Sequence, residues 1–139
     1  MNKINIIKIG TNILTTSKGS PNLNRLSQLV TQIANEIINS DKKFIIVTSG
    51  AITCGSNKIK IDPNLIQEKQ AAAAVGQILL MQEYCRLFAS YNITIGQILL
   101  TKIAIENEVQ KKNARNTILK LLEHNVIPII NENDSIATD

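Results

Sequence analysis

The sequence has no tryptophan, and aromatic residues make up only 3% of its 139 positions. Proteins that bind single-stranded nucleic acid use aromatic side chains on which bases stack. The formal net charge of +4 comes from Lys and Arg residues that are spread along the chain. Nucleic acid is therefore not expected as the main partner, and small anionic ligands such as nucleotides and carboxylates suit this charge at least as well.

Long hydrophobic runs are also lacking. The longest, such as residues 44–47 and 71–75, are far too short to cross a bilayer, and the first residues lack the apolar run and cleavage site of a signal peptide. Cysteine is scarce, because Cys54 and Cys85 are isolated thiols without CxxC spacing. They are expected to be ordinary small residues in or near the core. These absences predict a cytoplasmic protein with no membrane segment.

Two common glycine-rich nucleotide motifs are missing, since neither G-x-G-x-x-G nor G-x-x-x-x-G-K-[ST] occurs. Hydrophobic residues make up 44% of the sequence and charged residues 19%, which is the composition of a folded soluble protein. The length suits one domain with a sizeable core. Residues 1–139 are therefore predicted to form a single unit.

Strand and helix patterns alternate along the whole chain. Apolar, β-branched runs predict strands at residues 4–9, 44–47, 93–100 and 126–130. Helical spacing of apolar residues predicts helices over about 24–39, 67–90 and 108–124. Asp62-Pro63 is expected to begin the second helix, and Pro128 to place the fourth strand at an edge or bulge. The fold class is α/β, with a mainly parallel sheet.

The predicted helices also indicate which residues face the core. In the first helix the inward set is Leu26, Leu29, Val30, Ile33, Ala34, Ile37 and Ile38. In the second helix it is Ala74, Ile78, Met81, Cys85 and Phe88. The run Ala71–Ala74 with Gly76 is interpreted as a helix surface suited to close packing.

Small and polar residues follow each predicted strand. These are Gly10-Thr11, Ser49-Gly50-Ala51, Thr101 and residues 131–134. Ligands of open parallel sheets bind in the crevice beyond the carboxyl ends of the strands. Four strand ends of this kind predict a small-molecule site.

Each of these residue groups has a functional and a plain interpretation. Lys8, followed by Gly10 and Thr11, places an ammonium and backbone N–H groups where they can meet phosphate oxygens, or it is a lysine at a solvated strand end. Ser49-Gly50-Ala51 forms a seat for a carboxylate or phosphate, or a plain cap with a turn glycine. Residues 131–135 hold an amino acid or touch a metal, or form an Asx-rich turn.

Six segments together resemble glutamate 5-kinases of the amino acid kinase family, in order and with matching intervals over almost the whole chain. They are residues 7–11 (IKIGT), 46–52 (IVTSGAI), 69–77 (KQAAAAVGQ), 96–101 (GQILLT), 113–117 (NARNT) and 127–134 (IPIINEND). The resemblance implies a three-layer α/β/α amino-acid-kinase-like fold and phosphorylation of the γ-carboxylate of L-glutamate by ATP, the first step toward proline. Mg²⁺ is expected to enter with the nucleotide, with no metal held by the chain itself.

The resemblance also implies residue roles. Lys8 is the catalytic residue, which neutralises charge on the transferring phosphoryl group, and with Gly10 and Thr11 it binds the ATP phosphates. Ser49, Gly50 and Ala51 bind glutamate, and Asn131 and Asp134 hold its amino-acid end. The substrate carboxylate attacks directly, so no covalent nucleophile is needed.

The sequence departs from the family pattern at three positions. Asn12 stands where serine is usual, Ala104 where an aspartate is expected, and Lys111 where the residue is apolar or aromatic. The sequence ends at Asp139, where family members continue into a second substrate segment and the ATP-binding part. Residues 1–139 are therefore expected to be the N-terminal, substrate-binding part of a truncated kinase domain, inactive when isolated.

Three interpretations stay open at this level. The chain is a glutamate 5-kinase module completed by a separate C-terminal half, a non-catalytic remnant of a split or decayed gene, or a small glutamate-binding or interaction domain. L-Glutamate and ATP are the expected small-molecule partners, with a homo-oligomer as a further possibility.

Overall fold

The computed structural model describes residues 3–137. Within them the strands form one sheet in the order β1-β2-β4-β3, and every pairing is parallel. The strands are β1 (Ile4–Lys8), β2 (Lys43–Val47), β3 (Ile95–Leu100) and β4 (Ile127–Glu132). The predicted α/β class with a parallel sheet is confirmed. β4 extends past its predicted end, so Asn131 and Glu132 are strand residues rather than loop residues.

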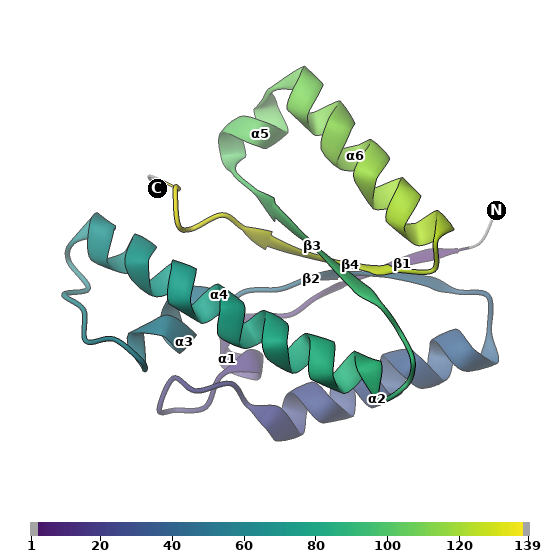
Figure 1. Ribbon diagram of the computed structural model, residues 1–139, viewed down its shortest axis with the longest axis horizontal. Helices are drawn as coiled ribbons and strands as arrows, with labels where there is room; N and C mark the ends of the chain where they lie inside the picture. Colours follow the sequence, from purple (N-terminus) through teal and green to yellow (C-terminus); the bar gives the residue numbers. More distant parts are fainter. Residues whose placement is uncertain (1–2, 138–139) are drawn as a thin grey trace.

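Helices cover both faces of the sheet. They are α1 (Thr11–Leu14), α2 (Leu23–Asn39), α3 (Ala51–Ser56), α4 (Ile66–Ala89), α5 (Lys102–Glu106) and α6 (Glu108–Glu123). Figure 1 shows α2, α3 and α4 on one face, and α5 and α6 on the other. This is the expected three-layer arrangement. No helix among the described residues is both long and apolar enough to span a membrane.

The second helical layer covers only part of its face. Ile9, which follows β1, is buried in the core with residues of α2, whereas Ile4 and Ile6 of β1 point the other way and are 44% and 67% exposed. Alternate strand residues point to opposite faces, so the exposed pair marks the face that α6 covers elsewhere. α6 packs over the β3–β4 half of the sheet, since it contacts β4 and a Cβ added to Gly96 of β3 would lie 3.1 Å from the Leu121 side chain of α6. The β1 half of that face is therefore open.

Pro128 does not mark an edge or a bulge, so that prediction is wrong. β4 lies between β2 and β3, and Pro128 is buried. The preceding residue, Ile127, donates its N–H to the Thr94 carbonyl on the β3 side at 3.0 Å. The backbone of Pro128 therefore faces β2, where pairing begins only at Ile129. Pro128 lacks the N–H that a ladder toward β2 would use at this position, and the absence of pairing before Ile129 accommodates it.

Asp62-Pro63 does not begin α4, so that expectation is wrong, whereas the predicted range 67–90 agrees with Ile66–Ala89 within one residue at each end. The Asn64 N–H donates to Asp62 Oδ1 at 2.9 Å, and the Leu65 N–H donates to the Asp62 carbonyl at 3.2 Å. Asp62 and Pro63 thus form an Asx-stabilised turn that precedes the helix. α4 begins at Ile66.

The buried face of α4 differs from the predicted face. Ile78 is 63% exposed, and Ala74 and Cys85 are exposed as well. Of the predicted set, Phe88 is buried and Met81 is half-buried. The buried residues are Ala72, Ala73, Gly76, Gln77, Leu80, Tyr84, Leu87 and Phe88. On α2 the prediction holds, except that Ile38 is exposed.

Two glycines let α3 and α4 cross with their backbones in contact. A Cβ added to Gly55 would lie 1.7 Å from the Ala72 carbonyl oxygen, and one added to Gly76 would lie 1.7 Å from the Ala51 carbonyl oxygen. Only hydrogen atoms fit in these spaces. The interpretation of the segment around Ala71–Gly76 as a close-packing surface is confirmed.

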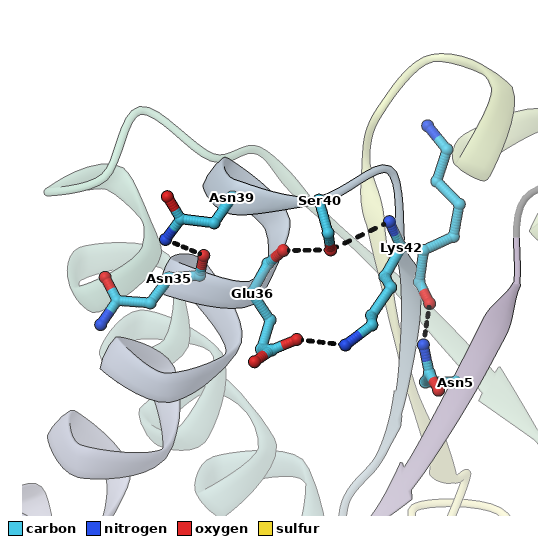
Figure 2. Close-up of polar contacts among 7 residues, drawn as sticks. Asn5, Asn35, Glu36, Asn39, Ser40 and Lys42 are labelled. Carbon is cyan, nitrogen blue, oxygen red and sulfur yellow. Dashed lines mark hydrogen bonds and ion pairs between the residues drawn. The ribbon is translucent and has the colours of Figure 1, made fainter.

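The amino-terminal edge of the sheet has its own polar contacts, shown in Figure 2. The Ser40 hydroxyl donates to the Glu36 carbonyl at 2.6 Å, the Glu36 carboxylate pairs with Lys42, and the Asn5 amide donates to the Lys43 carbonyl at 3.5 Å. Lys42 and Glu36 are exposed, and exposed ion pairs contribute little stability. These contacts end α2 and align β2 with β1. They lie at the opposite edge from the strand ends that carry the predicted site.

Candidate functional site at the carboxyl edge of the sheet

The predicted site residues lie along the carboxyl edge of the sheet. Lys8 ends β1, Ser49 follows β2, Asn131 is near the end of β4, and Thr101 follows β3. Because all four strands are parallel, these ends meet at one edge. The side chains nevertheless divide into two groups, one around β1 and β2 and the other around β4 and β3.

The first group joins the loops after β1 and β2. The Ser49 hydroxyl donates to the Ile9 carbonyl at 3.0 Å, and the Thr11 hydroxyl donates to Ser49 Oγ at 3.2 Å. Gly50 lies against Thr11 and Thr15, because a Cβ added to it would be 3.6 Å and 3.4 Å from their methyl groups. The structure therefore brings together the segments that contain Gly10-Thr11 and Ser49-Gly50.

Backbone conformation at Gly50 allows α3 to begin directly after β2. Its φ of 91° lies in the left-handed region, which glycine adopts without strain. The first backbone hydrogen bond of α3 runs from the Cys54 N–H to the Gly50 carbonyl at 3.0 Å. The N–H of Ala51, which precedes it, has no partner within the helix. Ala51 is buried, at 2% exposure, so its side chain fixes the position of this N–H.

Lys8 lies on a different face from the rest of the site. It is exposed and alternates with Ile4 and Ile6, which mark the open half of the sheet. Gly10 is also exposed, and a Cβ there would meet no atom within 4 Å. This open space next to a lysine and the free N–H groups at the start of α1 suits an anion. The residues present therefore fit phosphate oxygens.

The second group centres on Asn131, which is only 5% exposed. Its Nδ2 donates to Gln77 Oε1 at 2.8 Å, and its Oδ1 accepts the Glu132 N–H at 2.8 Å. Gln77 in turn donates from Nε2 to Gln97 Oε1 at 2.9 Å. The Asn131 side chain is therefore engaged within the protein and reaches the neighbouring hollow only through the two glutamines.

That hollow has a volume of about 240 Å³ and lies between α4 and the carboxyl ends of β3 and β4. Gln97, Glu132 and Asp134 line it, and Ala51 closes it on the α3 side. Partial burial raises the pKa of the Asp134 carboxyl, and the nearby Glu132 carboxylate raises it further. Two carboxylates in one hollow favour a cation such as an ammonium group.

We expect the Asp134→Asn variant to melt at a higher temperature than the wild type at neutral pH. The pKa of Asp134 is raised in the folded state, so the unfolded chain releases this proton at lower pH. Stability is lost as pH rises from the ordinary aspartate pKa to the raised value. Thermal melts at acidic and neutral pH measure this. Asp41→Asn, at an exposed aspartate, is the matched control, and equal melting temperatures for wild type and Asp134→Asn would contradict the expectation.

Thr101 is the N-cap residue of α5. Its Oγ1 accepts the Ala104 N–H at 3.1 Å and caps α5. Among residues 3–137, no group of three or more His, Cys, Asp or Glu side chains is placed to hold a metal ion.

The sequence prediction did not assign a site role to Gln77 or Gln97. Both stand in the motif segments, each as a polar residue in an apolar surrounding. That contrast was the available signal. Only the crossing of α4 over β3 and β4 shows that they meet Asn131.

The chain is an α/β protein with a parallel sheet, and N–H groups, amides and carboxylates lie along the carboxyl edge of that sheet. Comparison with known proteins gives the family. Residues 3–139 match the model of the amino acid kinase family, and the chain belongs to that family.

Its curated relatives include glutamate 5-kinases. The chain is 44% identical to that of Clostridium perfringens over 136 residues, 46% to that of Clostridium tetani over 136 residues, and 46% to that of Haemophilus influenzae over 143 residues. The matches cover 96%, 96% and 99% of this chain, but 50%, 51% and 38% of the relatives. The chain thus spans about half the length of the clostridial proteins, or less for the third. The resemblance inferred from the six motifs is confirmed.

Proposed function

We propose that this chain is the glutamate-binding part of a glutamate 5-kinase. In the complete enzyme it presents the γ-carboxylate of L-glutamate to ATP with Mg²⁺, in the cytoplasm. The observation that supports this most is the carboxyl edge itself. It joins the Thr11–Ser49–Gly50 contacts and the Asn131–Asp134 segment in a chain 44–46% identical to glutamate 5-kinases.

The proposed roles follow from position. Lys8 and the N–H groups around Gly10 and Thr11 attract the phosphates, which carry charge through the transfer. Ser49, Gly50 and Ala51 hold the γ-carboxylate beside them. ATP supplies the phosphoryl group, and the carboxylate oxygen attacks it directly.

At the other end of the substrate, Asn131 and Asp134 act on the amino-acid group. The Asp134 carboxylate attracts the ammonium, and Asn131 acts through Gln77. Phosphoryl transfer needs both reactants held in line. We therefore propose that catalysis requires nucleotide-binding elements beyond these 139 residues.

Calorimetric titration of the chain with L-glutamate tests the proposal. We expect the wild type to bind and Ser49→Ala to bind about tenfold more weakly, because the variant loses the hydroxyl that joins the loops after β1 and β2 and so holds the ligand-binding N–H groups in place, and each such hydrogen bond carries about 1 kcal/mol. Ser90→Ala is the matched control, because its hydroxyl donates to the Leu87 carbonyl at the far end of α4. Absence of any heat from the wild type with L-glutamate would refute the proposal.

A further inference from the structure

Three side-chain amides form a chain from the sheet to the hollow beside α4. Asn131 of β4 donates to Gln77 of α4, and Gln77 donates to Gln97 of β3, at 2.8 and 2.9 Å. Asn131 and Gln77 are 5% and 9% exposed, whereas Gln97 is exposed. The chain thus runs from a buried anchor to a surface residue.

The direction of each hydrogen bond is fixed by the backbone. The Glu132 N–H can only donate, and it donates to Asn131 Oδ1. Asn131 must therefore offer its NH₂ group to Gln77, which accepts through Oε1 and offers its own NH₂ group to Gln97. Gln97 accepts through Oε1, so its Nε2 is the outward end. Reversal of any one amide would place two donors or two acceptors face to face.

The outward NH₂ group of Gln97 belongs to the wall of the 240 Å³ hollow. Within residues 3–137 no acceptor for Gln97 Nε2 is present. The same hollow contains Asp134, whose pKa is raised by burial and by Glu132. One wall therefore supplies N–H donors and another supplies carboxylates. The α-carbon of an amino acid carries both a carboxylate, which can accept from the N–H donors, and an ammonium group, which can pair with the carboxylates.

We propose that Gln97 binds the α-carboxylate of the amino-acid substrate, and that Gln77 is a positioning residue that fixes the orientation of the Gln97 amide. This rests on the proposed function, because it takes L-glutamate as the ligand. Strands β2 and β4 separate Gln97 from Lys8. The γ-carboxylate must reach the Lys8 end for phosphoryl transfer, so the α-carboxylate is the one left for Gln97.

The direct test is Gln97→Glu, measured by calorimetry with L-glutamate. The substitution keeps the shape and the bond from Gln77, but it turns a donor into an anionic acceptor facing the ligand carboxylate. We expect the Kd to rise about tenfold or more. Because Gln97 is exposed, the fold should tolerate the change, as a thermal melt will show. Gln82→Glu, exposed on α4, makes the same charge change outside the hollow and is the matched control.

Ligand preference tests which carboxylate is bound. The wild type is expected to prefer L-glutamate to L-glutamate α-amide, in which the α-carboxylate has become a neutral amide. In Gln97→Glu that preference should shrink or reverse, because the new carboxylate can accept from the ligand NH₂ group. If Gln97 contributed only to the structure of the protein, Gln97→Glu would weaken the binding of both ligands equally.

The orientation role of Gln77 is tested with Gln77→Glu and with NMR of side-chain NH₂ groups. A carboxylate at this position accepts from Asn131 but cannot donate to Gln97, so the Gln97 amide must turn over and present its oxygen to the hollow. We expect weaker L-glutamate binding and a changed Gln97 NH₂ resonance, with the Asn131 NH₂ resonance still protected from exchange.

The outcomes separate the two proposals. If the wild type binds L-glutamate and Gln97→Glu binds with unchanged Kd, the assignment of Gln97 is wrong while the proposed function stands. If the wild type gives no heat, both are overturned. An unshifted Gln97 NH₂ resonance on addition of L-glutamate to the wild type would also count against the assignment.

Discussion

Replacing Gly76 with alanine is expected to leave the chain largely unfolded. The added Cβ would lie 1.7 Å from the Ala51 carbonyl oxygen and 2.5 Å from the Gly55 backbone nitrogen. Both are backbone atoms, so no side-chain rotation relieves the contact, and α3 must separate from α4. We expect a loss of more than ~4 kcal/mol, against ~5–15 kcal/mol for a whole domain.

Urea denaturation followed by circular dichroism measures this effect, and Gly55→Ala is expected to behave in the same way. Gly10→Ala is the control for stability, because a Cβ there meets nothing within 4 Å and its φ of −78° suits any residue. A Gly76→Ala protein with the midpoint of the wild type would show that the helices do not cross as described.

Truncation of Tyr84 is expected to have the next largest effect. Its ring is fully buried, at 0% exposure, and its hydroxyl is hydrogen-bonded to Thr48 Oγ1 at 3.0 Å. Tyr84→Ala creates a cavity under β2 and removes the partner of Thr48. We expect a cost of about 3–5 kcal/mol, whereas Tyr84→Phe keeps the ring and costs about 1 kcal/mol.

The same residue makes stability depend on alkaline pH. Burial raises the pKa of Tyr84 from 10.0 to about 12, partly offset by the hydrogen bond with Thr48. Because the unfolded chain loses this proton first, the free energy of unfolding should fall between pH 10 and about 12. Tyr84→Phe should lack this part of the decline in denaturation curves measured across that range. Parallel declines in both proteins would contradict the assignment.

The strand ends were predictable because they depend on two local signals. Apolar β-branched runs mark the strands, and the order of strands and helices makes the sheet parallel, so residues such as Ser49 and Asn131 fall at one edge. The strand order was not predictable in this way. Pro128 was predicted to lie at an edge or bulge because proline has no N–H to donate to a neighbouring strand. Whether a sheet accepts proline in an inner strand depends on which neighbour the backbone faces at that residue, and this is known only from the pairing of β4 with β3.

The face of α4 shows a different limit. Apolar residues occur all around this helix, so their spacing does not select one face. The choice is made by polar residues, because Gln77 and Tyr84 turn inward to meet partners on Asn131 and Thr48. These partners lie 54 and 36 residues away in the sequence. Helical periodicity carries no information about pairs so far apart in the sequence, and the sequence analysis missed the amide chain for the same reason.

The strand order also has a consequence for how the molecule is made. β4 occupies the position between β2 and β3, although it is synthesised last of the four. While the chain emerges from a ribosome, β3 has no neighbour in the sheet until β4 arrives, and long-range pairing of this kind is slow. The strand that joins the two halves also carries Asn131, the anchor of the amides at the hollow. Assembly of the sheet and assembly of the Asn131–Gln77–Gln97 amide chain are therefore one event.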